Sequence, residues 1–356
     1  MLLIFIALFA YPAVICVDIA EHLKTMTVKM PNGDMPILGL GTADAQAQAP
    51  PFTCADAVEA ALKIGYRHID TAIFYENHAD IKEGIKRSGI PREEIWITSK
   101  IAMHGSMLRA QGKPGRDTTV AFVDGMLAQL ETSYMDLVLT HFPAIEGEGL
   151  KVHNDIEMEG DLERANAIRA EIWKALESLV EVGKVRNIGV SNYLVPHLEE
   201  MSLYATIMPA VNQLELHPYL PRTDVREWCG LRKIIVEAYG SVVQDIYPDL
   251  LAENDVKRIA SAHNASPGQV ALSWALEKKI VVIPKSSKPA RIEENAKALG
   301  LTLTKEDIAA LDALDCSRHS NCRFPTRCGR FCTLGTYYWD PAQVPAFPPS
   351  KHEAEL

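Results

Sequence analysis

The chain has 356 residues, a length that suits either one large barrel or two ordinary domains. Its hydrophobic fraction of 47% is enough for a full core and is typical of a globular protein. The formal net charge of -10 offers no basic surface to a polyanion, so we expect no nucleic-acid partner.

The N-terminal residues have the pattern of a signal peptide. Residues 1–17 are almost wholly apolar, and Asp18 and Glu21 follow directly. The apolar run is shorter than the roughly 20 residues that a helix needs to cross a bilayer. We therefore predict cleavage near Cys16 and no stable membrane anchor afterwards. The alternative is an uncleaved signal anchor.

A β-hairpin is predicted next. The runs TVKM and MPIL flank Pro31-Asn32-Gly33-Asp34, and Asn-Gly between apolar runs is a strong hairpin signal. We expect this hairpin to cap the bottom of a barrel formed by the residues that follow.

The rest of the chain alternates between short apolar, β-branched runs and longer helical patterns, which indicates parallel βαβ units. The candidate strands are residues 37–40, 66–70, 95–99, 137–140, 187–190, 210–214, 234–238 and 281–283. Helical periodicity is clear in residues 54–65, 119–132, 165–183 and 254–264. These repeats predict an α/β fold, a (β/α)₈ TIM barrel. The alternative is an open doubly wound sheet, but no G-x-G-x-x-G follows the first strand.

The tail is rich in cysteine. Cys316, Cys322, Cys328 and Cys332 lack the C-x-x-C pairs of a zinc site, so we predict disulfides in a cysteine-rich C-terminal loop and tail, residues 315–356. The pairing stays open among three arrangements. The last residues, HEAEL, resemble an endoplasmic reticulum retrieval signal, although Ala354 stands where that signal has an acidic residue. We expect a protein of the secretory pathway, either secreted or retained in the lumen of the endoplasmic reticulum.

Polar residues lie at or just after the ends of the predicted strands. In a (β/α)₈ barrel the active site lies at the carboxyl ends of the strands, so these residues are expected to share one site. They are Asp70, Lys100, His141, Ser191, Asn192, Gln213, Glu215, Tyr239 and Lys285.

Tyr75, Lys100 and Asp70 together suit the reduction of a carbonyl group. Hydride addition leaves an alkoxide, which needs a proton donor. A phenol has an ordinary pKa of about 10, and a neighbouring ammonium favours its ionised form. Lys100 can supply that charge to Tyr75, and Asp70 would keep Lys100 charged, while His141 would orient the carbonyl oxygen. Taken singly, each residue is better explained as a solvated group or a helix cap; the combination is what favours catalysis.

The motifs GYRHIDTAIFY, ITSKI, DLVLTHFP, NIGVSN, NQLELHPY and IPKSSKPARIEEN, taken in order, resemble those of the aldo-keto reductases. The resemblance covers residues 26–314 and implies a (β/α)₈ barrel that uses no metal. By resemblance, the catalytic residues are Tyr75, Asp70, Lys100 and His141. The implied activity is NADPH-dependent reduction of aldehydes or ketones to alcohols by hydride transfer, with Tyr75 as general acid.

The resemblance also implies a site for NADP(H). Residues matching the nicotinamide end and the adjoining segment are Ser191, Asn192, Gln213, Tyr239 and Ser241. Residues matching the adenosine end are Lys285, Ser286, Arg291, Glu294 and Asn295. Two cations and a hydroxyl in one loop suit a 2′-phosphate, which favours NADP(H) over NAD(H).

The chain departs from the family pattern in a few places. His78 and Lys82 stand where relatives have glutamate and glycine, and a long loop carries Arg109, Lys113 and Arg116. Those cations suit a sugar acid such as a uronate, although an exposed flexible loop explains them as well.

We therefore expect a monomer acting on a small-molecule carbonyl compound. The alternative is a secreted or luminal barrel that binds cofactor or ligand without turnover, since NADPH is scarce outside cells. The intact set of catalytic residue types favours the enzyme.

Overall fold

The computed structural model describes residues 19–43, 53–102, 115–143, 162–242 and 248–315. The predicted signal peptide and the four clustered cysteines of the tail lie outside these residues, as do Arg109 and Lys113 of the long loop. Within the described ranges, no helix combines the length and the apolar character needed to cross a bilayer.

The described part of the chain begins with helix α1 (Ile19–Thr25) and an antiparallel hairpin of β1 (Thr27–Met30) and β2 (Gly33–Pro36). A hairpin is therefore present where Asn32 and Gly33 predicted one, although Gly33 is already the first residue of β2. Asn32 donates through its backbone nitrogen to Asn187 Oδ1 (3.1 Å) and through Nδ2 to Arg186 O (2.7 Å), at the start of strand β7 (Val185–Ser191). These contacts join the hairpin to the start of β7; that the hairpin caps the barrel stays a prediction.

Eight parallel strands form one sheet in which strands consecutive in the chain are neighbours, in the order β10-β9-β8-β7-β6-β5-β4-β3. Besides β7 they are β3 (Leu40–Gly41), β4 (His68–Asp70), β5 (Trp96–Ile101), β6 (Met135–Thr140), β8 (Val211–Glu215), β9 (Ile235–Tyr239) and β10 (Val281–Val282). Backbone bridges between Leu38 and Val282 and between Gly41 and Lys285 join the first strand to the last. The sheet is therefore closed, as the eight repeats predicted.

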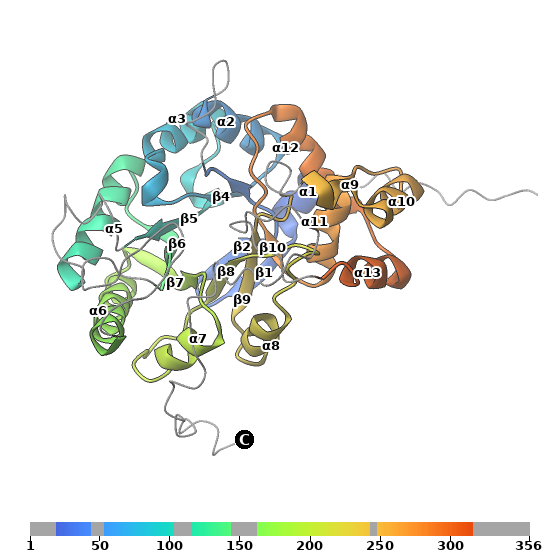
Figure 1. Ribbon diagram of the computed structural model, residues 1–356. Coiled ribbons are helices and arrows are strands. Elements are labelled where there is room, and N and C mark those ends of the chain that lie inside the picture. Colours follow the sequence, from blue (N-terminus) through green and yellow to red (C-terminus); the bar gives the residue numbers. More distant parts are fainter. Residues whose placement is uncertain (1–18, 44–52, 103–114, 144–161, 243–247, 316–356) are drawn as a thin grey trace, which may run out of the picture.

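Helices surround the strands (Figure 1). The α-helices are α2 (Cys54–Ile64), α3 (His78–Ser88), α5 (Arg116–Leu130), α6 (Leu162–Glu181), α7 (Val195–Met201), α8 (Thr223–Leu231), α9 (Pro248–Ala252), α10 (Asn254–Ala262), α11 (Pro267–Glu277), α12 (Pro289–Ala296) and α13 (Lys305–Asp312). Short 3₁₀ helices are η1 (Ile73–Tyr75), η2 (Arg92–Glu94) and η3 (Lys297–Gly300). Helices α2, α11 and α13 begin with a capping box, at Thr53, Ser266 and Thr304.

The strand boundaries differ from those predicted at both ends of the sheet. β3 holds only Leu40 and Gly41, because the chain on either side makes isolated bridges instead of a continuous ladder. The approach is close there: a Cβ on Gly41 would lie 2.6 Å from Ile283 O. Strand β5 ends two residues later than predicted, and β8 and β9 end one residue later. Lys100 therefore lies within a strand and Tyr239 ends one, whereas both were predicted to follow their strands. Gln213 lies within β8, as the predicted bounds 210–214 imply.

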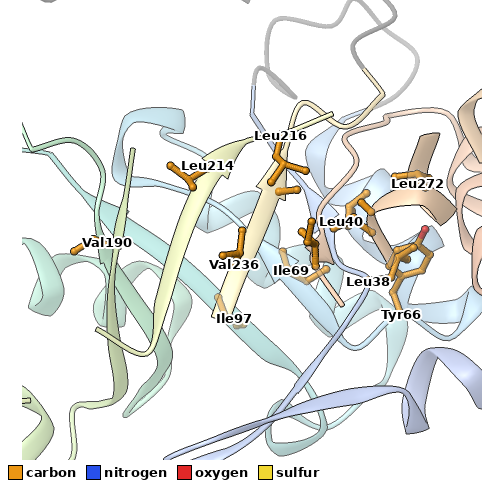
Figure 2. Packing of buried hydrophobic residues seen from close by; sticks show 14 of the residues in the cluster. Leu38, Leu40, Tyr66, Ile69, Ile97, Val190, Leu214, Leu216, Val236 and Leu272 are labelled. Carbon is orange, nitrogen blue, oxygen red and sulfur yellow. The ribbon is translucent and has the colours of Figure 1, made fainter. Parts of the chain in front are cut away.

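Side chains alternate between the barrel interior and the helices, as the twofold period of a strand requires. Outward-facing residues form the main hydrophobic cluster; Figure 2 shows Leu38, Leu40 and Tyr66 grouped with Leu272 of α11. A second cluster holds Trp96, Leu137, Leu139, Val211 and Val281 together with Met35 of the hairpin. On β5 and β8 these apolar residues point into the barrel on the same face as Lys100 and Gln213, and their neighbours in register include His68 and Glu237. The barrel interior is therefore apolar near the hairpin and polar toward the carboxyl ends of the strands.

Neighbouring strands pack closely around Gly189 of β7. A Cβ there would lie 2.6 Å from Val211 O and 2.7 Å from Leu139 Cδ2. Because one of these atoms is backbone, Gly189→Ala should lower the free energy of unfolding by about 1–3 kcal/mol. Gly125→Ala is the matched control, since nothing lies within 4 Å of a Cβ on this residue of α5. It should be neutral or raise the free energy of unfolding by up to about 1 kcal/mol. Urea unfolding measures both, and an equal response of the two variants would contradict the close packing.

Candidate active site

A buried ion pair lies inside the carboxyl end of the barrel. Lys100 Nζ donates to Asp70 Oδ1 (2.7 Å), to Asp70 Oδ2 (2.8 Å) and to Thr71 O (2.8 Å), which uses all three ammonium hydrogens. The side chains of Lys100 and Asp70 are only 1% and 4% exposed. Burial alone would lower the pKa of Lys100, but the charges of Asp70 and Tyr75 oppose it and raise that pKa above its ordinary value. Lys100 is therefore charged at neutral pH.

Tyr75 and His141 lie beside this pair. Lys100 Nζ is 5.3 Å from the centroid of the Tyr75 ring, and the Tyr75 and His141 rings meet edge to face with centroids 6.0 Å apart. Phe142 stacks on His141 at 4.5 Å, and the ring of Phe74 is 5.8 Å away. Tyr75 is partly exposed while Lys100 is buried, so the phenol lies between the ammonium and the solvent.

Asn77 holds the segment that carries Tyr75. Its Oδ1 accepts from Thr71 Oγ1 (2.6 Å), and its Nδ2 donates to Thr42 O (3.0 Å) and Thr42 Oγ1 (3.1 Å). Thr42 in turn donates from its backbone nitrogen to Asp70 O (3.0 Å). This web ties the 3₁₀ turn η1 to the ends of β3 and β4 and fixes the position of Tyr75 relative to the ion pair.

The residues predicted for the nicotinamide form a continuous hydrogen-bonded chain. Asn192, at φ 64, donates through Nδ2 to His141 O (3.0 Å) and Ser191 Oγ (3.1 Å), and accepts at Oδ1 from Tyr239 OH (2.8 Å). Ser191 Oγ donates to Gln213 O (3.0 Å), and Gln213 Nε2 donates to Asp70 Oδ2 (2.8 Å). The structure thus brings these four predicted residues together with the ion pair.

The residues predicted for the adenosine end line a separate cavity of about 380 Å³. The predicted members are Lys285, Ser286, Arg291, Glu294 and Asn295. Ser266, Pro267 and Gly268 add the N-terminal turn of α11, where backbone N–H groups and the helix dipole favour an anion. Ser241 lies between Tyr239 and Val242, a further residue that lines this cavity, and its Oγ donates to Leu216 O (3.2 Å).

Two interior residues were missed by sequence reasoning. Glu237 of β9 is fully buried and accepts at Oε2 from Gln213 Nε2 (2.6 Å). His68 of β4 is also fully buried, and its Nε2 lies 3.5 Å from Glu237 Oε1. The available signal was parity: Glu237 lies two residues before Tyr239, so both face the same side of β9. Sequence reasoning instead counted Glu237 as part of an apolar strand, residues 234–238.

The two departures at the start of α3 have different outcomes. His78 is buried and pairs through Nε2 with Ser99 Oγ (2.9 Å), and burial lowers its pKa to about 4. Lys82 lies on the surface and donates to Glu131 Oε1 (2.9 Å). Only His78 therefore lies near the ion pair, behind the strand that carries Lys100.

Comparison with known proteins agrees with this architecture. A family model described as "Aldo/keto reductase family" matches residues 37–315. The chain belongs to the aldo/keto reductase family, as its motifs predicted, and so to the oxidoreductases.

Named relatives cover most of the chain. A glyoxal reductase of Bacillus subtilis is 39% identical over 290 residues, which are 81% of this chain and 92% of the relative. Aldose reductase B of Dictyostelium discoideum is 35% identical over 307 residues, 82% of this chain and 94% of the relative. The solved structure of MGS-M4, an aldo-keto reductase from a Medee basin deep-sea metagenome library, matches with a TM-score of 0.69 at 34% identity. That match covers 82% of this chain and 96% of MGS-M4.

Removing the Lys100 ammonium should show how much the ion pair contributes to the free energy of unfolding. Lys100→Met leaves Asp70 buried without its cation, which should lower the free energy of unfolding by about 3–5 kcal/mol at neutral pH. Burial raises the pKa of Asp70, and the ammonium no longer opposes this. The folded variant then binds a proton at Asp70 more readily than the unfolded chain does, so the loss should grow as the pH rises and shrink as it falls.

The control is Lys63→Met, because Lys63 is 57% exposed and pairs with Glu59 on the surface of α2. Its effect should stay within about 1 kcal/mol. Chemical unfolding at pH 5 and pH 7 measures both variants. A pH-independent loss in Lys100→Met that is no larger than the control's would contradict the ion pair.

Proposed function

We propose that this protein reduces aldehyde or ketone carbonyls to alcohols with NADPH, using Tyr75 as the proton donor. The observation that carries the proposal is the buried Lys100–Asp70 pair beside the ring of Tyr75, at the carboxyl end of the barrel. Its relatives include a glyoxal reductase, an aldose reductase and an aldo-keto reductase, and these names favour an enzyme over a protein that only binds a ligand.

The proton is delivered by Tyr75. Bound NADPH would supply the hydride to the carbonyl carbon, and negative charge then grows on the carbonyl oxygen. The Tyr75 phenol donates its proton to that oxygen, and the nearby Lys100 ammonium stabilises the phenolate that remains. Asp70 keeps Lys100 charged in a site that would otherwise favour the neutral amine. Tyr239 is the less suitable phenol, because burial raises its pKa.

His141 is proposed to orient the carbonyl oxygen. Its ring lies edge-on to Tyr75 and is held by stacking on Phe142. A carbonyl oxygen placed between the two residues would accept from both the imidazole and the phenol. Phe74 and Phe142 make the surroundings apolar, which strengthens these hydrogen bonds.

The residues present fit a dinucleotide with a 2′-phosphate. Lys285, Ser286 and Arg291 together with the N-terminal turn of α11 form an anion-binding donor set around one cavity. Glu294 and Asn295 line the same cavity and suit the polar edge of an adenosine. Ser191, Asn192, Gln213 and Tyr239 would hold the nicotinamide, and Ser241 the segment between the two ends.

The substrate class is part of the proposal. Small dicarbonyls and aldoses are suggested by the names of two relatives, and uronates by the cations of the loop before α5. The chain is proposed to act as a monomer. Its proposed location is the secretory pathway, and this part rests on its apolar first residues and its clustered tail cysteines.

Tyr75→Phe should reduce turnover by about 10²–10⁴-fold, because it removes the proton donor and little else. Turnover is followed by the loss of NADPH absorbance with glyoxal, an aldohexose and a hexuronate. NADPH binding should persist in the variant. Tyr134→Phe is the control, since Tyr134 lies between Arg92 and Arg186 at the other end of the barrel. A Tyr75→Phe variant with unchanged turnover would exclude the phenol as proton donor.

Arg291→Leu should weaken NADPH binding by about ten- to a hundredfold, the effect of losing charge-assisted hydrogen bonds worth about 1.5–3 kcal/mol. NADH binding should change little, because NADH has no 2′-phosphate. Arg258→Leu is the control, on the exposed face of α10 where Arg258 pairs with Asp255. Titration calorimetry with each dinucleotide decides the question, and equal losses for NADPH and NADH would contradict the phosphate site.

A further inference from the structure

Glu237 is a fully buried carboxyl group that contacts the proposed nicotinamide site, and the proposed function gives it no role. It is the register partner of Gln213 across the β8–β9 ladder. Gln213 Nε2 donates to Glu237 Oε2 (2.6 Å) and to Asp70 Oδ2 (2.8 Å). Both hydrogens of one amide nitrogen are therefore committed to two carboxyl groups of the barrel interior.

This arrangement fixes the orientation of the Gln213 amide. A flipped amide would place its oxygen against two carboxyl oxygens, which repel it. With Nε2 turned to Asp70 and Glu237, Oε1 is the only amide atom left for a ligand, and it can only accept a hydrogen bond. A primary carboxamide offers a matching N–H donor.

The charges around Glu237 favour its neutral form. Asp70 and His68 face it from β4, Lys100 and Thr98 from β5, and Gln213 from β8, while its register partner on β10 is Val281. The single ammonium in this set is already bonded to both oxygens of Asp70. Burial, and then the charge of Asp70, raise the pKa of Glu237 to about 8.

His68 does not supply a second cation. Its Nδ1 lies 3.1 Å from Pro36 O, a pure acceptor, so the ring hydrogen is on Nδ1. Nε2 is then an acceptor nitrogen that faces Thr98 Oγ1 at 3.1 Å and lies 3.5 Å from Glu237 Oε1. Burial lowers the pKa of His68 to about 4, so the ring is neutral at neutral pH. His68 therefore offers no hydrogen-bond donor and no positive charge to an ionised Oε1.

We propose that Glu237 is a positioning residue, a neutral carboxylic acid that, together with Asp70, holds Gln213 with its amide oxygen available to the nicotinamide carboxamide. By staying neutral, Glu237 also leaves Lys100 to balance Asp70 alone. This inference rests on the proposed use of a nicotinamide cofactor. Because Glu237 acts through Gln213, the effects of substituting these two residues on NADPH affinity should be coupled.

The protonation of Glu237 is tested on the protein without cofactor. Difference infrared spectra should contain a carboxylic acid carbonyl band at pH 7 that is lost as the pH rises to 9.5 and is absent from Glu237→Gln. Glu177→Gln is the matched control, because Glu177 is buried on α6 and accepts from Thr206 N (2.6 Å) and Ile207 N (2.7 Å). This variant should keep the band. A spectrum at pH 7 with no acid band that depends on Glu237 would overturn the inference.

The coupling is tested by NADPH affinity, measured through quenching of protein fluorescence. Glu237→Leu should weaken binding by about three- to tenfold, and Glu237→Gln, which keeps an oxygen acceptor for Gln213, should lose less. In a Gln213→Leu background, Glu237→Leu should have no further effect. An equal loss in both backgrounds would mean that Glu237 acts on the fold in general and would overturn the positioning role.

The outcomes separate this inference from the proposed function. If Glu237→Leu does not fold, the infrared spectra and the milder Glu237→Gln variant still decide. If the wild-type protein binds no NADPH, the proposed function fails and the role of Gln213 fails with it. The infrared band would in that case still report whether Glu237 is a neutral acid.

Discussion

The buried pair of Lys100 and Asp70 is the interaction on which the site depends. Moving an ammonium out of water is costly, and the cost is offset only when geometry and hydrogen bonding are complete. Here every ammonium hydrogen has an acceptor, two of them on one carboxylate. The pair thereby places a positive charge 5.3 Å from the centroid of the Tyr75 ring, at the carboxyl end of the barrel. A surface lysine would be screened by water and could not influence a phenol so strongly.

The barrel makes this placement possible because its interior changes character along its axis. Near the hairpin the inward residues are apolar, with Trp96 and Met35 in one cluster. Two residues further along β5 and β8, the inward residues are polar: Thr98 follows Trp96, and Gln213 follows Val211. Thr98 bridges the two layers: it accepts from Trp96 Nε1 (3.1 Å) and pairs with His68 Nε2 (3.1 Å). Among the described residues, the apolar layer therefore lies between the polar layer and the hairpin.

Much of the fold and site could be predicted from the sequence. Apolar runs located the strands, and the order of motifs pointed to candidate site residues, several of which the structure brings together at the ends of the strands. Boundaries were less accurate where β3 meets β10, since the close approach at Gly41 depends on residues more than two hundred positions away. Glu237 was missed for a related reason: its environment is made by β4, β5 and β8, none of which is local to it. Tyr75 lies in a segment that is held partly by a local contact, between Asn77 and Thr71, and partly by the contacts of Asn77 with Thr42, 35 residues away.

We propose that the Lys100 ammonium lowers the pKa of the Tyr75 phenol, and an ultraviolet difference titration measures this effect directly. Tyrosinate absorbance is followed against pH, and subtraction of the Tyr75→Phe spectrum isolates the signal of Tyr75. We expect this phenol to ionise at a distinctly lower pH in the wild-type protein than in Lys100→Met. Ionisation at the same pH in both proteins would contradict it.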